Sequence, residues 1–571
     1  MITRHLGWTR FYEGCLNSPL RNEIRERLQE VVTNYPVDMM YFDGPYQGMD
    51  QRQQFCHCKY CRVAYRKARG KDIPLQNGTA SLDDIVEYKL WLSDDVVDGF
   101  MHEICDMVRQ ARDVPIVYND TGLLGGDWRS RAYRYVDGFM FEAADTPEQK
   151  LFNMRVGQST GKVIWTYISS HTEYNREHVE DKSKRGWYSN PVAGRRLLLD
   201  GAVATAAGVG YCYWGLNRVF YVSGDILNHE SVRSVREVFA FARDHELLLR
   251  SVRREPQLGI VVGTQTVQWY QESLFVPHAY ANYYYGAHQL IKSLSYDAEP
   301  FLDYDITLKR LRAFRLVYAP NVACLSDAQC SALEGYVRQG GILLATHLSS
   351  VADEFGRLRK DYGLSAMFQA TLTPPQPVEL VDLYLRLSSG KLIPQDPQVM
   401  LFKARANARV LAETYSRGDR KVLGPAILHS QHGKGQVIYI GSGLEAIYEE
   451  TLNGSLRAYF RRLLDPILNP SRSYEVDFKP GLLHQFALSE NILLLHLLAN
   501  TGDIWKKLLV QEHFLPVKNV QVRVRLPENR RVKSVTLMWS GKQAAWRVES
   551  GWVKLTVPEV EVYEVIRVDL A

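Results

Sequence analysis

The sequence predicts an α/β protein: a (β/α)8-type, TIM-like barrel that lacks its first strands, then a flavodoxin-like α/β domain, then a C-terminal β-sandwich. Three observations lead to this order. Short apolar strands alternate with amphipathic helices up to about residue 250, and a second alternating region follows them. The last part of the chain changes to a strict two-residue alternation of apolar and polar side chains. We place the domains at 1–252, 253–470 and 471–571.

Size and composition exclude several classes of protein. A chain of 571 residues with 46% hydrophobic and 23% charged side chains can bury several cores, so it is neither a peptide hormone nor a disordered segment. A formal charge of +5 is too small to favour nucleic acid as a partner. No apolar run approaches the ~18 residues of a membrane span, and the N-terminus has no signal-peptide core. The sequence as it stands predicts a cytoplasmic protein without a membrane partner, or an exported one if a signal peptide precedes it.

Five strands are expected in the barrel region, at 37–42, 115–118, 136–141, 162–168 and 208–214. The spacing of apolar residues predicts helices at 18–33, 84–112 and 231–249. A complete barrel needs eight strands, and no clear strand precedes Val37. Either this barrel is incomplete or the chain starts inside it.

The second region has the same alternating pattern. Strands are expected at 258–262, 300–304, 316–319, 342–346 and 437–441. Helices are expected at 278–294, 327–339 and 456–464. Several prolines between 353 and 423 predict a hairpin-like insertion. In the tail, Val520, Val522 and Val524 alternate with polar residues, which is typical of a β-sandwich.

Two acidic residues end predicted strands at the same face of the barrel. Asp43 ends the first strand and Glu142 follows the third. Strand ends separated by one neighbour lie roughly 10 Å apart, so the two carboxyls could face each other. Glycoside hydrolysis needs such a pair, one as nucleophile or base and the other as proton donor. The alternatives are that Asp43 only caps the following loop and that Glu142 pairs with an arginine and braces the barrel.

Other polar and aromatic side chains lie in the strands or just after them. A ring of carboxylates, amides and aromatic faces suits a sugar, because hydroxyls need planar polar partners and the C–H face packs on aromatic rings. Taken singly, each residue also has an ordinary role in a turn, a loop or the core. The substrate-binding candidates are Tyr41, Tyr46, Asn119, Asp120, Trp165, Tyr167, His171, Glu173 and Trp214.

Three cysteines lie close together, at Cys56, Cys58 and Cys61. Thiolates at this spacing can converge on a tetrahedral Zn(II) if a fourth ligand arrives from elsewhere. Cys15 is the natural fourth ligand, and His57 is its rival. A site closed by four ligands would be structural, with no open position for catalysis. Ordinary free cysteines are the alternative, and no organic cofactor is expected.

These residues resemble a known family. Three motifs of this sequence resemble the barrels of glycoside hydrolase family 42 β-galactosidases and their relatives. They are Cys15-Leu16-Asn17-Ser18-Pro19, the strand ending in Phe42-Asp43-Gly44, and Cys56-His57-Cys58 with Cys61. The sequence looks most like the hypothetical glycosyl hydrolases with a β-galactosidase trimerisation-like domain, which are themselves similar to α-L-fucosidases. Residues 258–465 resemble that domain, which is class I amidotransferase-like, and 492–500 resemble the opening of the C-terminal β-domain.

The resemblance implies a carbohydrate substrate, a trimer or dimer, and zinc bound by Cys15, Cys56, Cys58 and Cys61. The chain departs from the family 42 pattern at the catalytic positions. Asp43 stands where those enzymes have Asn-Glu, and the strand at 162–168 ends without a glutamate. Asp43 with Glu142 looks more like the fucosidase arrangement, which implies Asp43 as nucleophile and Glu142 as acid/base. If 37–42 is the fourth barrel strand, the first three are absent.

The leading hypothesis is a retaining glycoside hydrolase, fucosidase-like or β-galactosidase-like, acting on an oligo- or polysaccharide. A non-catalytic carbohydrate-binding or assembly protein on a degenerate barrel is the alternative, because losing three strands would leave the pocket open on one side. A zinc-dependent hydrolase at the cysteine cluster is the weakest hypothesis, because four thiolates close the metal.

Overall fold

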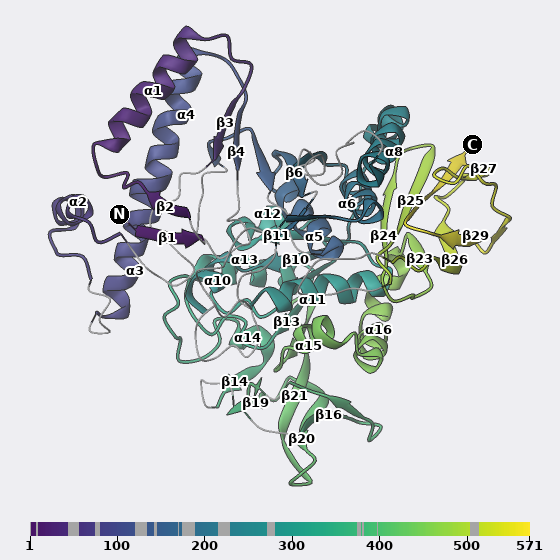
Figure 1. Cartoon of the computed structure of the whole chain (residues 1–571). Coiled ribbons are helices and arrows are strands. Elements are labelled where there is room, and N and C mark those ends of the chain that lie inside the picture. Colours follow the sequence, from purple (N-terminus) through teal and green to yellow (C-terminus); the bar gives the residue numbers. More distant parts are fainter. Residues whose placement is uncertain are drawn as a thin grey trace.

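The structure is a computed structural model. It describes residues 2–6, 9–43, 56–74, 80–119, 134–141, 146–169, 171–173, 189–214, 229–270, 280–373, 378–379, 382–396, 398–502 and 513–571. Three sheet systems lie side by side, with the last of them, the yellow C-terminal part, on the right of Figure 1. Among the helices of these residues, none has both the length and the apolar character that crossing a membrane requires.

The first sheet contains the five strands expected from the sequence. They are all parallel and lie in sequence order, as β3 (Met40–Asp43), β4 (Ile116–Asn119), β5 (Gly138–Phe141), β6 (Val163–Ser169) and β9 (Gly210–Trp214). Within the described ranges, no strand pairs with the outer edge of β3 or of β9. This is the arrangement of successive β/α units in a barrel wall, here seen as an open sheet.

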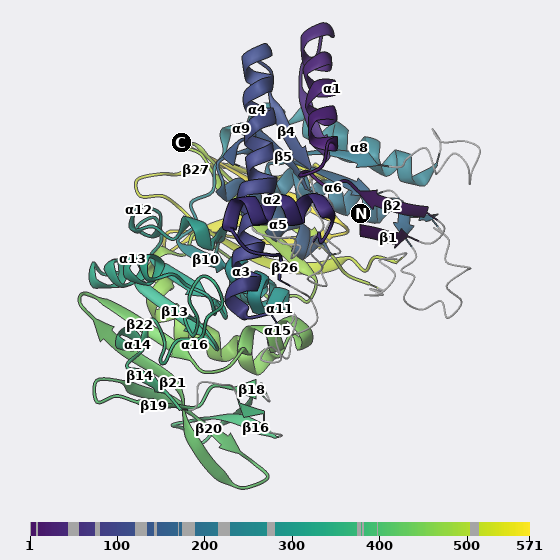
Figure 2. The same cartoon turned by 90° about the vertical axis from the view of Figure 1, so that its left-hand side faces the viewer.

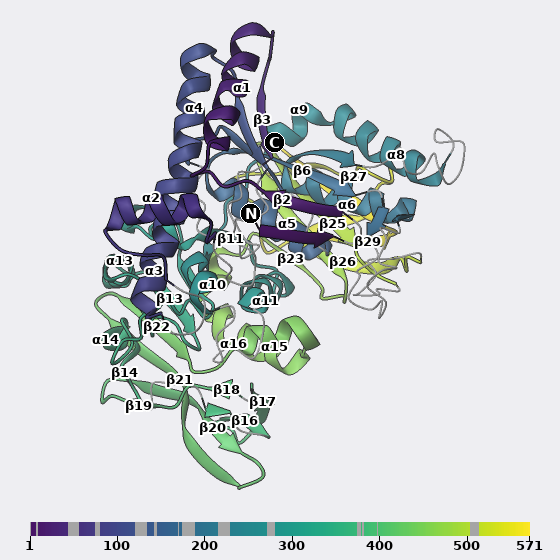
Figure 3. The same ribbon diagram turned by 60° about the vertical axis from the view of Figure 1, so that its left-hand side comes forward.

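Helices accompany these strands. They are α1 (Leu20–Asn34), α2 (Lys59–Arg69), α3 (Leu82–Leu90), α4 (Gly99–Ala111), α5 (Pro147–Ser159), α6 (Gly194–Ala207), α8 (Glu230–Asp244) and α9 (Glu246–Ser251). Figures 2 and 3 show α1 and α4 standing side by side and projecting from the rest of the molecule. Arg21 of α1 holds this pair together through Glu103 of α4, at 2.6 Å.

The single helix expected at 84–112 is interrupted by a wider π-helical segment, Trp91–Asp98, between α3 and α4. The buried residues explain the change. Leu92 and Val97 are both buried in the core and lie five positions apart, which matches the i to i+5 spacing of a π-helix. A regular α-helix would turn one of these side chains away from the core.

The N-terminal segment differs from the expectation that no strand precedes Val37. Strand β1 (Ile2–Leu6) pairs antiparallel with β2 (Thr9–Glu13), and this hairpin joins neither edge of the five-stranded sheet. Each strand has only five residues, too few for a period to stand out in the sequence. The hairpin therefore adds no strand to the five-stranded sheet.

The second sheet has nine strands in the order β11-β10-β12-β13-β22-β21-β20-β16-β17. The parallel strands are β10 (Leu258–Val262), β11 (Ala298–Leu302), β12 (Leu316–Ala319), β13 (Ile342–Thr346) and β22 (Gly435–Ile440). The strand expected at 300–304 lies two residues earlier, because Asp303–Asp305 form a 3-10 turn. Helices α11 (Tyr280–Ser293), α13 (Asp327–Arg338), α15 (Leu444–Thr451) and α16 (Gly454–Leu468) accompany this sheet.

The proline-containing stretch between 353 and 423 contributes more than an insertion. It contains β16 (Leu383–Leu387), β17 (Leu392–Pro394) and β20 (Arg409–Ser416), and β20 pairs with the long β21 (Lys421–His432). These antiparallel strands extend the second sheet and form the arm at the bottom of Figure 1. The expected hairpins are present, but their pairing with β22 depends on contacts that the local sequence does not show.

The C-terminal part is a sandwich of two four-stranded antiparallel sheets. One consists of β23 (Tyr474–Val476), β26 (Val517–Arg525), β29 (Trp552–Val560) and β28 (Trp546–Glu549). The other consists of β24 (Leu482–Leu488), β25 (Ile492–Ala499), β30 (Tyr563–Leu570) and β27 (Val532–Leu537). Val520, Val522 and Val524 point into the core that both sheets share, as the alternation predicts.

A buried carboxyl lies under the second sheet. Glu445, in the first turn of α15, is fully buried and accepts a hydrogen bond from the Thr346 hydroxyl at the end of β13. Burial raises the pKa of Glu445 to about 7. The carboxyl therefore keeps its proton in the folded chain at pH values where it has lost it in the unfolded chain.

Replacing this carboxyl should change how stability depends on pH. Between about pH 4.5 and 7 the folded state binds the extra proton, so the free energy of unfolding falls as the pH rises. The variant Glu445→Gln has no such proton and should gain stability relative to the native chain across this range, by up to about 3 kcal/mol. Urea unfolding at several pH values measures this. Exposed Glu450→Gln on the same helix is the control, and identical pH profiles for the two variants would contradict the prediction.

Candidate functional site

The strand register brings several of the expected site residues into one row across the five-stranded sheet. Asp43 is paired with Asn119, Asn119 with Met140, Met140 with Trp165, and Trp165 with Gly210. Asp43 and Asn119 are the last residues of their strands. The row therefore reaches the carboxyl edge of the sheet at β3 and β4, where barrel enzymes place their reacting groups, and crosses the earlier parts of β6 and β9.

The two faces of this sheet differ. Met40, Phe42 and Ile164 belong to a core cluster that includes helix residues, and Ile168 packs against α6 and α8. Because side chains alternate along a strand, Tyr41 and Trp165 lie on the other face, which these helices do not cover. Tyr41 is 39% exposed, while Asn119 is 3% exposed. On this face, the phenol ring of Tyr41 is therefore accessible and the amide of Asn119 is buried.

Trp165 depends on a glycine for its position. An added Cβ at Gly210 would lie 2.6 Å from Cδ1 of the indole, so the ring lies directly over the backbone of β9. Tyr167, two residues further along β6, is paired with Cys212 on the same face. Both aromatic candidates on β6 are half-buried. They form a continuous aromatic strip on the face opposite the helices.

The structure places the remaining candidates only in part. Tyr46, Asp120 and Glu142 lie outside the described residues. The backbone positions of Asp43, His171, Glu173 and Trp214 are described within their strands, but their side chains are not. His171 and Glu173 lie in β7 (His171–Glu173), which pairs with β8 (Ser189–Pro191) in a separate two-stranded sheet. These two residues therefore do not continue the row on β6.

An ionic group beneath the sheet was not predicted. Asp200 of α6 binds Lys150 of α5 at 2.6 Å and Arg196 at 3.1 Å, and all three side chains are buried. Burial alone would raise the pKa of Asp200, but Arg196 and Lys150 outweigh it and lower the pKa. The residues of α5 and α6 are far apart in sequence, so no local pattern could reveal the group. It fixes the two helices that cover the outer face of β5, β6 and β9.

The four predicted cysteines meet at one point. The sulfur atoms of Cys15, Cys56, Cys58 and Cys61 all lie within 4.8 Å of one another. The Sγ of Cys15 is 3.4 Å from the Sγ atoms of both Cys58 and Cys61. In a tetrahedral site with Zn–S bonds of about 2.3 Å, the sulfurs are about 3.8 Å apart, so these spacings fit a metal ion. His57 does not belong to the set of converging ligand atoms found in the described part of the chain.

The surroundings of the cluster favour negative charge. Cys58 is the N-cap of α2 and accepts a hydrogen bond from the amide of Cys61, so the sulfurs lie at the positive end of that helix. The side-chain amide of Asn17 donates to the Sγ of Cys61 at 3.3 Å. Hydrogen bonds from Cys15 and Cys61 lower the pKa of Cys56, and the same contacts raise the pKa values of Cys15 and Cys61, so the negative charge is held first at Cys56. A group of thiols held in this way could bind a metal ion as thiolates.

Residues 303–463 match the family model described as the β-galactosidase trimerisation domain. The chain has the fold of the glycoside hydrolase family 42 group and carries its trimerisation domain. The matched segment covers most of the nine-stranded sheet, including all the antiparallel strands of its arm. No curated protein matches the sequence.

Solved structures agree over nearly the whole chain. An α-L-fucosidase, isoenzyme 2 from Paenibacillus thiaminolyticus, has a TM-score of 0.70 at 15% identity, covering 99% of this chain and 83% of that one. A catalytic mutant of a family 42 β-galactosidase from G. stearothermophilus has a TM-score of 0.74 at 14% identity, with 99% and 84% covered. A β-galactosidase from Bacillus circulans sp. alkalophilus has a TM-score of 0.72 at 13% identity, with 98% and 84% covered. These likenesses establish the family 42 fold.

The contact between Trp165 and Gly210 can be tested. Gly210→Ala should push the indole off β9 and lower the free energy of unfolding by about 1–3 kcal/mol, because the added methyl group overpacks the sheet. Near-UV circular dichroism should change at the tryptophan bands, and urea unfolding gives the stability. Gly454→Ala is the control, since an added Cβ there meets nothing within 4 Å. Equal stabilities of the two variants would be incompatible with the contact.

Proposed function

We propose that the chain is a retaining glycoside hydrolase, fucosidase-like or β-galactosidase-like, with Asp43 as nucleophile and Glu142 as acid/base. The observation that carries the proposal is the pair of neighbouring strand ends at which the backbone of Asp43 is paired with Asn119, in one row with Trp165. The solved structures with this fold are named as an α-L-fucosidase and as β-galactosidases. A carboxylate and an amide at neighbouring strand ends, with an indole in the same row, suit the hydrolysis of a glycosidic bond.

The proposed reaction has two steps. In the first, a carboxylate oxygen of Asp43 attacks the anomeric carbon, the bond to the leaving oxygen breaks, and Glu142 gives its proton to that oxygen. In the second, Glu142 takes a proton from water, which attacks the same carbon and releases Asp43. The strip of Trp165 and Tyr167 would pack against the apolar face of the sugar, as would Tyr41 on the same face of the sheet, and Asn119 would bind a hydroxyl.

The nucleophile can be tested with a pair of variants. Asp43→Asn should lower the turnover of an activated aryl glycoside by at least about a thousandfold, because an amide cannot form the glycosyl-enzyme. Asp38→Asn, an exposed aspartate just before β3, is the matched control and should keep the native rate. Glu142→Gln should retain more activity on substrates whose leaving group needs no proton than on those whose leaving group does. Native turnover by Asp43→Asn would rule out the assigned nucleophile.

We infer that zinc is the metal of the cysteine cluster and that its role is structural. Four sulfur ligands complete a tetrahedral site and leave no position for a substrate or water. The ligands come from the segment before α1 and from the start of α2, so a bound ion would tie these segments together. The same closure argues against a zinc-dependent hydrolase at this position.

Metal content and thermal stability test the zinc site. The purified chain should contain about one zinc per molecule, and Cys61→Ser should lose it and melt at a lower temperature. Cys212→Ser is the control, because Cys212 lies on β9 and takes no part in the cluster. A native melting temperature after complete removal of zinc by a chelator would contradict a structural role.

For the second sheet, we propose a flavodoxin-like domain at 253–470 between a barrel domain at 1–252 and the sandwich at 471–571. The parallel strands follow one another across the sheet as second, first, third, fourth and fifth, which is the flavodoxin-like order. The match to the trimerisation domain supports a trimer or dimer.

A non-catalytic carbohydrate-binding or assembly protein is the second candidate function. One observation favours it: in the part of the chain that the structure describes, the outer edges of β3 and β9 have no partner strand. Reacting groups in a barrel usually come from several strands, so an open wall supplies fewer of them. Binding of an oligosaccharide by the native chain without any turnover would support this candidate.

A further inference from the structure

A cavity lies where all three sheet systems meet. It is away from the strand ends that carry Asp43 and Asn119. It has a volume of about 650 Å³. Its wall is formed by the start of α5, by one side of α11, by the end of α15, and by the sandwich segments 476–484, 500–502 and 515–517. Cavities of roughly 300–1,000 Å³ at the junction of structural units are typical of small-molecule sites.

The polar lining of this junction cavity contains more acceptors than donors. Four carboxylates line it, at Glu148, Glu449, Glu450 and Asp477. Lys292 is the most buried cation in the lining, and its ammonium group already binds Asp297 at 3.3 Å and the Tyr474 hydroxyl at 3.1 Å. Lys479 binds Asp477 at 3.1 Å. The lining therefore favours a ligand that donates several hydrogen bonds and carries no negative charge.

One pair of lining residues is arranged in advance for such a ligand. The side-chain amide of Asn500 donates to both oxygens of Glu148, at 3.1 Å each, and Asn500 is 4% exposed. Within the described residues, the side-chain oxygen of Asn500 has no hydrogen-bond partner. The oxygen is itself buried, so the amide serves to fix the carboxylate, and the half-buried Glu148 is the group of the pair that can accept further hydrogen bonds.

The rest of the lining is apolar and partly exposed. Leu452 is 40% exposed and Leu515 is 64% exposed, and both lie on the wall of the cavity. Phe478, Leu482 and Leu483 are half-buried there. Such side chains suit the C–H face of a sugar ring, while the carboxylates and amides suit its hydroxyls.

We propose that the junction cavity is a second carbohydrate site, which binds a neutral mono- or disaccharide without cleaving it. Glu148, oriented by Asn500, accepts hydrogen bonds from neighbouring hydroxyls, and the leucines and Phe478 cover the apolar face of the ring. The site is independent of the strand-end carboxylates, and it does not require the chain to be a hydrolase. Because α5, α11 and the sandwich all line it, a bound sugar holds the three parts together.

A matched pair of serine variants tests the site. Ser293 is the last residue of α11 and lines the cavity, and its hydroxyl binds the carbonyl of Leu290 at 2.7 Å. Ser251 is the last residue of α9, lies outside the cavity, and binds the carbonyl of Leu248 at 2.8 Å. Ser293→Trp should fill the cavity and weaken binding of D-galactose and L-fucose at least about tenfold, whereas Ser251→Trp should bind as the native chain does. Isothermal titration calorimetry of the full chain measures both affinities.

A second pair of variants tests the site even if Ser293→Trp does not fold. Glu148→Gln keeps the size of the side chain but removes its charge, and should weaken sugar binding about three- to tenfold. Glu246→Gln changes the corresponding first-turn glutamate of α9 and should have no effect. Thermal melts establish that each variant is folded.

Hydrolysis of an aryl glycoside, followed in parallel, separates this proposal from the proposed function. Weakened binding with native kcat/KM in Glu148→Gln supports the cavity site. If no variant hydrolyses the glycoside but the differences in sugar affinity remain, only the proposed hydrolase activity is contradicted. Unchanged affinity in folded Ser293→Trp and Glu148→Gln, or no heat from either sugar, would overturn the cavity site. Binding of putrescine with no binding of sugar would also overturn it, since the carboxylates would then serve an amine.

Discussion

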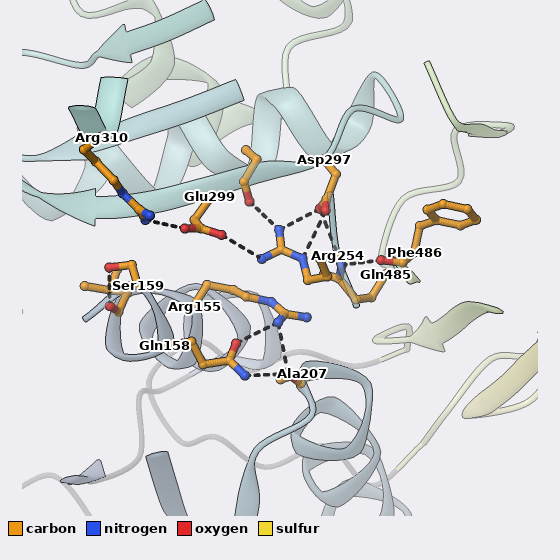
Figure 4. A network of polar contacts seen from close by, with 12 residues as sticks. Arg155, Gln158, Ser159, Ala207, Arg254, Asp297, Glu299, Arg310, Gln485 and Phe486 are labelled. Carbon is orange, nitrogen blue, oxygen red and sulfur yellow. Dashed lines mark hydrogen bonds and ion pairs between the residues drawn. The ribbon is translucent and has the colours of Figure 1, made fainter. Parts of the chain in front are cut away.

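One buried carboxylate, Asp297, joins the second sheet to the C-terminal sandwich. It precedes β11 and receives hydrogen bonds from Arg254, in the segment after α9, at 2.9 and 3.0 Å and from Gln485 of β24 at 3.4 Å (Figure 4). Lys292 of α11 also donates to it, at 3.3 Å. Burial alone would raise the pKa of Asp297, but Arg254 and Lys292 outweigh it and hold the pKa well below its usual value. Without this carboxylate, two buried cations would lose the anion that they share, so the position of the sandwich on the second sheet depends on it.

The same junction explains how an open five-stranded sheet keeps its shape. Phe152 of α5 contacts the rings of Tyr284, Tyr285 and His288 on α11, with ring centres 5.2–5.4 Å apart. Next to them, Arg155 donates to the last carbonyls of α6 at 3.0 and 3.2 Å (Figure 4). Barrel closure normally removes the edges of such a sheet. Here α5 and α6, which cover one face of the five-stranded sheet, pack against the neighbouring parts of the molecule instead. This packing holds the strands in register.

The sequence was most informative where local pattern and tertiary structure agree. The strands β10, β12 and β13 begin and end where predicted, because strands buried on both faces are continuous apolar runs. The convergence of Cys15 on the later cysteines was predicted from the chemistry of four sulfur ligands. The addition of β20 and β21 to the second sheet, and the pairing of Lys150 with Asp200, were not predictable, because they depend on contacts between distant segments. Asn119 was found by its strand-end position and Trp165 as an aromatic residue within a strand, but their common row required the register.

The strand-end row and the junction lie on opposite sides of the same helices, and this separation has a physical reason. A reacting carboxylate needs access to water and substrate, so it belongs at the edge of a sheet. The ion pairs that hold the parts together are strong only where they are shielded from water, so they lie in the buried junction. Helix α5 connects the two regions: Lys150 faces Asp200 of α6, while Phe152 and Arg155 lie at the junction. Any movement between the three parts would therefore be transmitted through α5 to the strands β5 and β6 that it connects.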